Sequence, residues 1–222
     1  MSALNDFQDE LFTGINFLIN IISEYKNKND IEIEIRIGQI QYDGFKSGLG
    51  NKEFYNKIKT KLDESKAWKK VLNTKTEEIC NNGIRRIDKF NNKKVPKHEY
   101  IKKQKHLVKD LQYYGTPYDI RLCASTEIKT DSKIKAGEGI LRKKNRNSYY
   151  YKDYIIDLTL VEQIQNGVTN INYELEIELI NLKNEVSDKY RAHSALLLIR
   201  DLINMCEDIE VGSKILEPLE EE

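Results

Sequence analysis

The sequence predicts an α+β fold: a closed antiparallel β-barrel of about eight strands with flanking N- and C-terminal helices. Three observations support this prediction. The middle of the chain reads as consecutive strands with short links, amphipathic stretches bracket it, and several strands carry charged residues on one face. The 222 residues suit one large domain, so we expect residues 1–222 to form a single unit.

The overall composition excludes several classes of protein. The chain has 36 Lys and Arg residues against 36 Asp and Glu residues, which argues against a generic basic nucleic-acid binder. No apolar run approaches the ~18 residues of a transmembrane helix, and the acidic N-terminus does not resemble a signal peptide. We therefore expect no membrane partner. The three cysteines, Cys80, Cys123 and Cys206, are widely spaced, so we expect reduced thiols and a cytoplasmic location.

The first predicted element is an amphipathic helix over residues 3–26. A second, short helix is predicted from Lys52 to Trp68, with Asn51 as a possible N-terminal cap. The apolar residues of the first helix recur at three- and four-residue steps, which forms one stripe for packing. They are Leu4, Phe7, Leu11, Ile15, Leu18, Ile22 and Tyr25.

Eight strands are predicted between residues 30 and 182. Turn signals such as Asn81-Asn82-Gly83 and Asn166-Gly167 separate several of them. Consecutive strands with short links favour an antiparallel barrel or sandwich. The predicted strands are Ile31–Ile40, Lys70–Cys80, Ile84–Phe90, His98–Leu111, Asp119–Lys129, Ile140–Tyr151, Tyr154–Gln163 and Asn170–Leu182.

A C-terminal helix is predicted from residue 185 to residue 206. Its apolar stripe includes Ala195, Ile199 and Leu202 at helical spacing. The acidic tail that follows, residues 213–222, is expected to fray or to serve as a linker to a further domain.

Three of the predicted strands have an unusual charged face. Side chains alternate along a strand, so residues 31–37 place isoleucines on one face and charged residues on the other. Residues 173–179 repeat this arrangement with three carboxylates, and residues 142–146 gather three basic side chains on one face. The charged residues on these faces are Glu32, Glu34, Arg36, Arg142, Lys144, Arg146, Glu174, Glu176 and Glu178.

A charged strand face is ordinarily exposed to solvent. Here, however, like charges lie next to each other on one face, where they repel. The opposite faces of residues 31–37 and 173–179 are almost entirely Ile and Leu, so they must pack against something, and the helices can supply that partner. We therefore expect the apolar faces to point outward and the charged faces to point into the barrel, the reverse of an ordinary barrel.

A charged interior has chemical consequences. An uncompensated carboxylate in a dry interior costs on the order of tens of kcal/mol, so the interior must be hydrated and its charges compensated. Carboxylate oxygens are suitable ligands for Mg²⁺ or Mn²⁺, and guanidinium groups match phosphate oxygens. A divalent cation beside a polyphosphate indicates phosphoryl transfer or phosphohydrolysis.

Three motifs in this chain resemble those of one family. They are Glu-x-Glu-x-Arg-x-Gly at residues 32–38, Arg-x-Lys-x-Arg-x-Ser-Tyr at residues 142–149, and Glu-x-Glu-x-Glu at residues 174–178. In this order they resemble the signature strands of the triphosphate tunnel metalloenzymes, in particular the RNA 5′-triphosphatases of mRNA cap synthesis. With the Lys, Asn and Ile bias, the set is most similar to the triphosphatase domains of giant-virus (mimivirus-type) capping enzymes.

The resemblance implies roles for the acidic strands. Glu32, Glu34 and Glu178 would hold the metal ion, either Mg²⁺ or Mn²⁺. Glu174 and Glu176 would bind metal-coordinated or attacking water.

The resemblance also implies roles for residues on the strands between them. Lys144 and Arg146 would hold the γ-phosphate, and Arg142 would buttress the acidic strands. Glu127 would orient the attacking water, and Asp157 matches an Asp-x-Thr element of the family.

The family has two further basic residues whose positions in this chain are ambiguous, because two neighbouring residues could each match. One is Arg85 or Arg86, with Arg85 preferred. The other is Lys103 or Lys105, of which Lys103 is preferred.

The function implied is removal of the γ-phosphate from 5′-triphosphate RNA, the first step of mRNA cap formation, together with NTP hydrolysis. Guanylyltransferase and methyltransferase domains are the expected covalently linked partners, and the location would be the host cytoplasm or the virion if the source is viral. Alternatives are a tunnel enzyme acting on thiamine triphosphate, tripolyphosphate or ATP, and a barrel that binds RNA or polyphosphate without chemistry. The helix that precedes Glu32 favours the RNA enzyme, because small-triphosphate relatives usually begin close to this motif.

Overall fold

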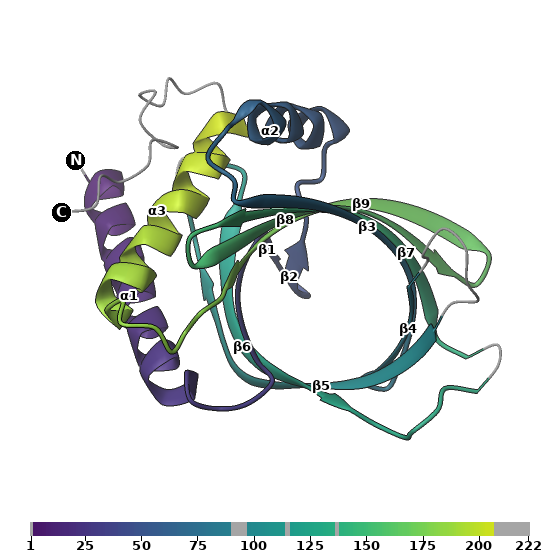
Figure 1. The fold of residues 1–222 in the computed structure, drawn as a ribbon. Coiled ribbons are helices and arrows are strands. Elements are labelled where there is room, and N and C mark those ends of the chain that lie inside the picture. Colours follow the sequence, from purple (N-terminus) through teal and green to yellow (C-terminus); the bar gives the residue numbers. More distant parts are fainter. Residues whose placement is uncertain (1, 90–96, 114–115, 136–137, 207–222) are drawn as a thin grey trace.

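The computed structural model describes residues 2–89, 97–113, 116–135 and 138–206. Within these residues the chain forms nine strands and three helices (Figure 1). The helices are α1 (Ser2–Tyr25), α2 (Lys52–Glu64) and α3 (Asp188–Cys206). The strands are β1 (Ile31–Gln41), β2 (Gly44–Ser47), β3 (Lys70–Asn81), β4 (Ile84–Lys89), β5 (Lys97–Leu111), β6 (Asp119–Lys129), β7 (Ile140–Tyr151), β8 (Tyr154–Gln165) and β9 (Val168–Leu179).

Eight of these strands close into a barrel, which Figure 1 views along its axis. The order around the ring is β1, β6, β5, β4, β3, β7, β8 and β9, and the pairing of β9 with β1 closes it. All of these pairs are antiparallel. The predicted barrel of about eight strands with flanking helices is therefore confirmed. β2 was not predicted, because its four residues are too few to show a strand periodicity.

The apolar faces of the strands point outward, as predicted from the alternation. Ile33, Ile35 and Ile37 of β1 are fully buried on the outer face of the barrel. The helices α1 and α3 pack against each other and lie along this side of the barrel, next to β1, β5, β6 and β9 (Figure 1). The hydrophobic core therefore lies between the barrel wall and the helices.

The short helix α2 lies beside the outer faces of β7 and β9. Asn51 caps it as predicted, because its side chain accepts a hydrogen bond of 2.7 Å from the Glu53 N–H. The helix is shorter than predicted, since the backbone becomes extended at Ser65. Trp68, the predicted last residue, lies beyond the helix and packs on Tyr149 with ring centroids 5.4 Å apart.

The junction between the barrel and α3 also differs from the prediction. β9 ends at Leu179, three residues early, and Asn181 then adopts a left-handed backbone with φ 55°. α3 begins at Asp188 because the Ser187 hydroxyl caps it, accepting a hydrogen bond of 3.1 Å from the Tyr190 N–H.

Two remaining expectations concern the ends of the chain and its thiols. The predicted helix over residues 3–26 corresponds to α1, whereas the predicted acidic tail, residues 213–222, lies outside the described residues. Cys80 and Cys123 are free thiols. Among the described helices, none combines the length and the apolar character needed to cross a membrane.

Candidate active site in the barrel lumen

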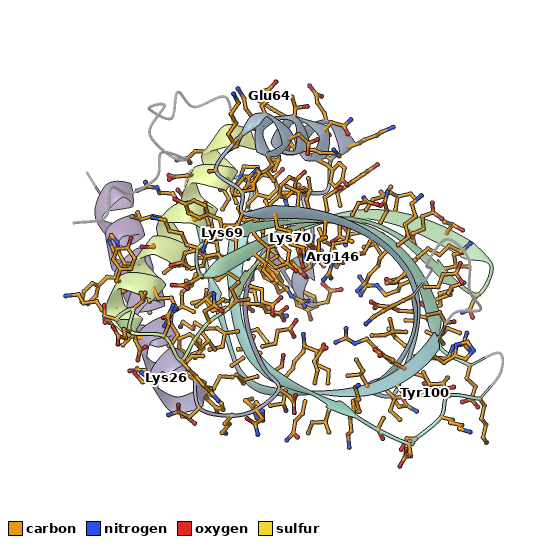
Figure 2. All side chains as sticks on the ribbon, in the orientation of Figure 1. Lys26, Glu64, Lys69, Lys70, Tyr100 and Arg146 are labelled. Atoms are coloured by element: carbon orange, nitrogen blue, oxygen red, sulfur yellow. The ribbon has the colours of Figure 1, made fainter. Side chains whose placement is uncertain are left out.

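The charged faces of the strands line the lumen of the barrel. Two cavities of about 530 Å³ and about 360 Å³ lie there. Both are lined by Glu32, Arg85, Lys144 and Arg146, so these four residues mark where the cavities adjoin. Figure 2 shows Arg146 inside the ring of strands. The lumen thus brings together acidic and basic residues from strands far apart in the sequence.

The acidic side of the lumen is formed by β1 and β9. Glu34 and Glu178 are Cα partners across these strands, which places their side chains on the same inner face. Glu32 lies on that face two residues from Glu34. Lys103, on β5, forms ion pairs with Glu32 and, at 3.1 Å, with Glu34. The three predicted metal ligands therefore lie on adjacent strands.

Arg36 links the two acidic strands from the inner face of β1. Its guanidinium lies 2.8 Å from the Glu34 carboxylate and 3.1 Å from that of Glu176. Burial disfavours ionisation of Glu176, but Arg36 and then Arg146 outweigh it and lower its pKa to about 2. Glu176 therefore stays ionised, which suits it to accept a hydrogen bond rather than a proton.

Glu178 differs from the other carboxylates of the lumen, because it forms no ion pair with a described residue. Burial first, and then repulsion by Glu32 and Asp157, raises the pKa of Glu178 to about 7. Within the described part of the chain no three Asp, Glu, His or Cys side chains converge to hold a metal ion, and Lys103 instead bridges Glu32 and Glu34. Even so, this set of oxygen donors with an uncompensated carboxylate fits a hard divalent cation.

The basic side of the lumen comes from β7, and each of its cations is paired with an acid. Arg142 lies 2.6 Å from Glu174 on β9. Arg146 lies 2.8 Å from Asp157 on β8 and 3.9 Å from Glu176. These pairs hold the guanidinium groups in place, and they connect the predicted phosphate-binding side chains of β7 to carboxylates on β8 and β9.

Asp157 is buried at the centre of this network. It accepts a hydrogen bond of 2.5 Å from the Ser148 hydroxyl in addition to its pairing with Arg146. Burial raises the pKa of Asp157, although Arg146 opposes that effect. Two residues on, Thr159 is also buried, and its hydroxyl has no hydrogen-bond partner among the described residues. The predicted Asp-x-Thr element therefore faces the lumen.

Glu78 on β3 is a site residue that the sequence analysis missed. It is only 5% exposed, and its carboxylate lies 2.8 Å from the Lys144 ammonium on β7. Burial opposes ionisation of Glu78, but Lys144 outweighs it and keeps the pKa of this carboxyl below its usual value. Burial lowers the pKa of Lys144, and Glu78 counteracts this shift. The alternation along β3 places Glu78 on the same face as Thr74 and Thr76. That face carries no repeated charge, so the sequence gives little indication that Glu78 belongs to the site.

The structure separates the alternatives on β4. Arg85 lines both cavities, and its guanidinium lies 2.6 Å from Glu127 on β6. Arg86 points to the opposite face and pairs with Asp88 at 2.8 Å, so it does not reach the lumen. Glu127 also lies 3.8 Å from Lys103. Glu127 is thus held between two cations.

Lys103 and Lys105, the two candidates for the predicted lysine on β5, both line the larger cavity. Lys103 lies among the carboxylates, whereas Lys105 forms no ion pair with a described residue. Arg121 lines the same cavity and pairs with Asp110 at 2.6 Å. Cys123 also lines this cavity, and burial raises the pKa of its thiol.

Two solved structures with a similar fold are RNA triphosphatases. The S. pombe Pct1 RNA triphosphatase superposes with a TM-score of 0.69 at 18% identity, covering 88% of this chain and 92% of that chain. The RNA triphosphatase domain of a trifunctional mimivirus mRNA capping enzyme superposes with a TM-score of 0.57 at 18% identity, covering 85% of this chain and 95% of that chain. At this identity the likeness concerns the fold.

Sequence comparison identifies the family directly. No curated protein matches the chain in sequence. The family described as mRNA capping enzyme, beta chain, matches residues 45–196, which include β3–β9 and all but the first of the three charged motifs. The match covers more than half of the chain, and the fold and lumen agree with it. The chain belongs to the mRNA capping enzyme beta-chain family.

Proposed function

We propose that the chain removes the γ-phosphate from 5′-triphosphate RNA, leaving a 5′-diphosphate end and inorganic phosphate. The observation that carries this proposal is the convergence of carboxylates from β1 and β9 with basic side chains from β4, β5 and β7 around one cavity in the lumen. Such a lumen accommodates a polyphosphate and a cation at once. Membership of the capping-enzyme family supports RNA as the substrate.

The basic side chains would bind and orient the triphosphate. Lys144, Arg146 and Arg85 line both cavities, so they can surround the phosphate that is transferred. Each is held by an acid partner at 2.6–2.8 Å, and fixed cations stabilise developing charge without rearrangement. Their charges would stabilise the phosphoryl group as its bond to the β-phosphate oxygen breaks.

Glu32, Glu34 and Glu178 would hold a divalent cation, either Mg²⁺ or Mn²⁺. When bound, such an ion neutralises charge on the γ-phosphate oxygens. The donors fit this role because all three are carboxylates and Glu178 lacks a cationic partner among the described residues. Lys103, which bridges Glu32 and Glu34, would then interact with phosphate oxygens instead.

The attacking water would be oriented by carboxylates of the lumen. Its oxygen forms the new bond to the γ-phosphorus, and the electron pair of the broken bond leaves with the β-phosphate. Glu127 would orient this water, because Arg85 and Lys103 hold its carboxylate at the lumen wall, and the proton of the water would leave with the phosphate product. Glu176, whose pKa is about 2, would accept a hydrogen bond from the water without taking the proton.

This reaction would be the first step of mRNA cap formation. The mimivirus relative is described as a trifunctional capping enzyme, which supports guanylyltransferase and methyltransferase activities as partners of this domain. The free thiols Cys80 and Cys123 are compatible with the proposed cytoplasmic location, in the host or the virion if the source is viral.

The test compares phosphate release from 5′-triphosphate RNA, ATP and tripolyphosphate, each with Mg²⁺ and with Mn²⁺. We expect all three to be hydrolysed, with the highest kcat/KM for RNA. A preference for ATP or tripolyphosphate over RNA would instead indicate a small-triphosphate enzyme. Binding of RNA without phosphate release would indicate a non-catalytic barrel.

A further inference from the structure

The two ends of the lumen differ in charge. The larger cavity is lined by eight Lys and Arg side chains, Arg36 and Arg121 among them, and by four Glu side chains. The smaller cavity is lined by five Lys and Arg and three Glu side chains. A polyanionic chain that follows the triphosphate is favoured at the more cationic end.

An aromatic hairpin stands at this cationic end. β1 and β2 form it, and Phe45 is the Cα partner of Ile40, which places both side chains on the inner face of the hairpin. The Phe45 ring lies against the Arg121 guanidinium, 4.5 Å from ring centroid to carbon. In the axial view of Figure 1, β2 lies inside the outline of the ring, so the hairpin leans across this end.

Gly38 explains why the hairpin can adopt this position. A Cβ atom at this residue would lie 2.2 Å from the Lys46 carbonyl oxygen and 2.7 Å from the Phe45 ring. The glycine of the first charged motif is therefore required for the hairpin to fold over the wall. At the tip of the hairpin, Tyr42 is fully exposed, so its ring is accessible to a ligand.

We propose that the RNA enters the lumen through this end, with its first nucleotides stacked on Phe45 and Tyr42 and its phosphates bound by Arg121 and Lys105. Aromatic rings and cationic side chains are the groups that hold single-stranded RNA without reading its sequence. Arg121 also pairs with Asp110, which holds its guanidinium in place. Lys105 is free for this role, since it pairs with no described acid. The inference rests on the proposed function and specifies the direction in which the substrate lies.

The direction agrees with the geometry of an in-line displacement, in which the attacking and leaving oxygens lie on opposite sides of the phosphorus. Glu127 lines only the smaller cavity. A water beside Glu127 would attack from that side, so the leaving β-phosphate and the RNA would point toward Arg121 and the hairpin. The RNA would therefore not pass through the smaller, less cationic cavity.

Photocrosslinking tests the direction without requiring turnover. A short 5′-triphosphate RNA with 4-thiouridine as its first or second nucleotide is bound to the wild-type chain in EDTA, irradiated and mapped by mass spectrometry. We expect crosslinks to residues 40–46. Crosslinks to the opposite end, near Lys70 and Tyr150, or the absence of crosslinks to the hairpin, would overturn the proposal.

Kinetics supply the second test. Tyr42→Ala and Phe45→Ala should each lower the ratio of kcat/KM for RNA to kcat/KM for tripolyphosphate by about fivefold or more, the loss expected for one stacked base. Phe12→Ala, which removes an exposed aromatic side chain on α1, and Tyr150→Ala should leave the ratio unchanged. An unchanged ratio in both hairpin variants contradicts the proposal. A wild-type chain that hydrolyses neither substrate refutes the proposed function instead, while the crosslinks still report where RNA binds.

Discussion

Glu78 and Lys144 form a buried ion pair across β3 and β7, with 2.8 Å between the carboxylate and the ammonium. Both side chains are less than a tenth exposed. Lys144 also faces Arg142 and Arg146 on its own strand, and both of these cations favour loss of its proton. Glu78 is thus the residue that keeps Lys144 charged at the point where the two cavities adjoin.

Substitution of Glu78 by Gln should therefore impair the enzyme in a pH-dependent way. Without the carboxylate, the pKa of Lys144 falls further below its usual value, so the ammonium is lost at lower pH. We expect the alkaline limb of the pH–rate profile to move to lower pH, and kcat above that limb to fall by about 10²-fold, as for other losses of a charge-stabilising group. The measurement is the pH dependence of kcat on triphosphate RNA.

Glu77→Gln is the matched control, because Glu77 is adjacent but points to the outer face, where it lies 4.0 Å from Lys143. Its profile should overlay that of the wild type. An E78Q profile that falls in height without moving along the pH axis would show that Glu78 acts only in folding.

The carboxylates of β1 and β9 should be required for metal binding as well as for turnover. Replacement of Glu34 or Glu178 by Ala should lower kcat by about 10²-fold or more, since a bound cation contributes several kcal/mol of charge stabilisation. In the wild type, Mn²⁺ should raise the Tm, because a ligand that binds only the folded state stabilises it. Differential scanning fluorimetry should show this rise reduced or abolished in both variants.

Glu162→Ala controls for the loss of a carboxylate, because Glu162 lies on β8 but is absent from the residues lining the two lumen cavities. It should retain both the activity and the Mn²⁺-dependent rise in Tm. A full rise in Tm in E34A and E178A would place the metal elsewhere.

Arg85 and Arg86 provide a matched pair for the face that contacts substrate. Arg85→Ala removes a cation of the lumen and the partner that holds Glu127 at 2.6 Å, so kcat should fall by about 10²-fold. Arg86→Ala removes only the ion pair with Asp88 on the outer wall, so its kcat should remain near that of the wild type. Steady-state phosphate release from both variants decides which of the two arginines faces the substrate. Equal losses of kcat in the two variants would contradict the assignment to Arg85.

Gly38→Ala tests the close approach of the hairpin to the barrel. The added methyl group would overlap the Lys46 carbonyl and the Phe45 ring, and overpacking of this kind costs about 1–3 kcal/mol. The Tm should therefore fall by several degrees. Gln41→Ala, in the same hairpin but exposed, should melt with the wild type. A G38A variant of wild-type stability would show that the hairpin can move aside without cost.

Much of the barrel follows from the alternation in the sequence. Because Ile33, Ile35 and Ile37 alternate with charged residues, an apolar outer face and a charged lumen could be predicted before any coordinates. The ends of β9 and α3 were misplaced, since they depend on the left-handed conformation of Asn181 and on the capping hydroxyl of Ser187. These are local effects that periodicity does not detect.

Where charges repeat along a strand, the alternation alone predicts that they face the lumen, whereas the isolated Glu127 and Asp157 came only from the family resemblance and Glu78 was missed. Glu78 is the one acid on the inner face of β3, since its neighbour Glu77 points outward, and its importance depends on the register that places it near Lys144. The choice between Arg85 and Arg86 is of the same kind, because adjacent residues differ only in the face that the closed barrel gives them. The pairing of strands that are distant in the sequence decides which side chains meet in the lumen, and the alternation pattern does not show this pairing.

The central claim is that this lumen hydrolyses the bond between the β- and γ-phosphates of an RNA end with the help of a divalent cation. The most direct measurement follows the γ-phosphate and the RNA end together, with doubly labelled 5′-triphosphate RNA, with Mg²⁺ or Mn²⁺ and with EDTA. We expect inorganic phosphate and diphosphate-ended RNA in equal amounts with the cation, and neither product in EDTA. Release of pyrophosphate, or no cleavage with either cation, would contradict this mechanism.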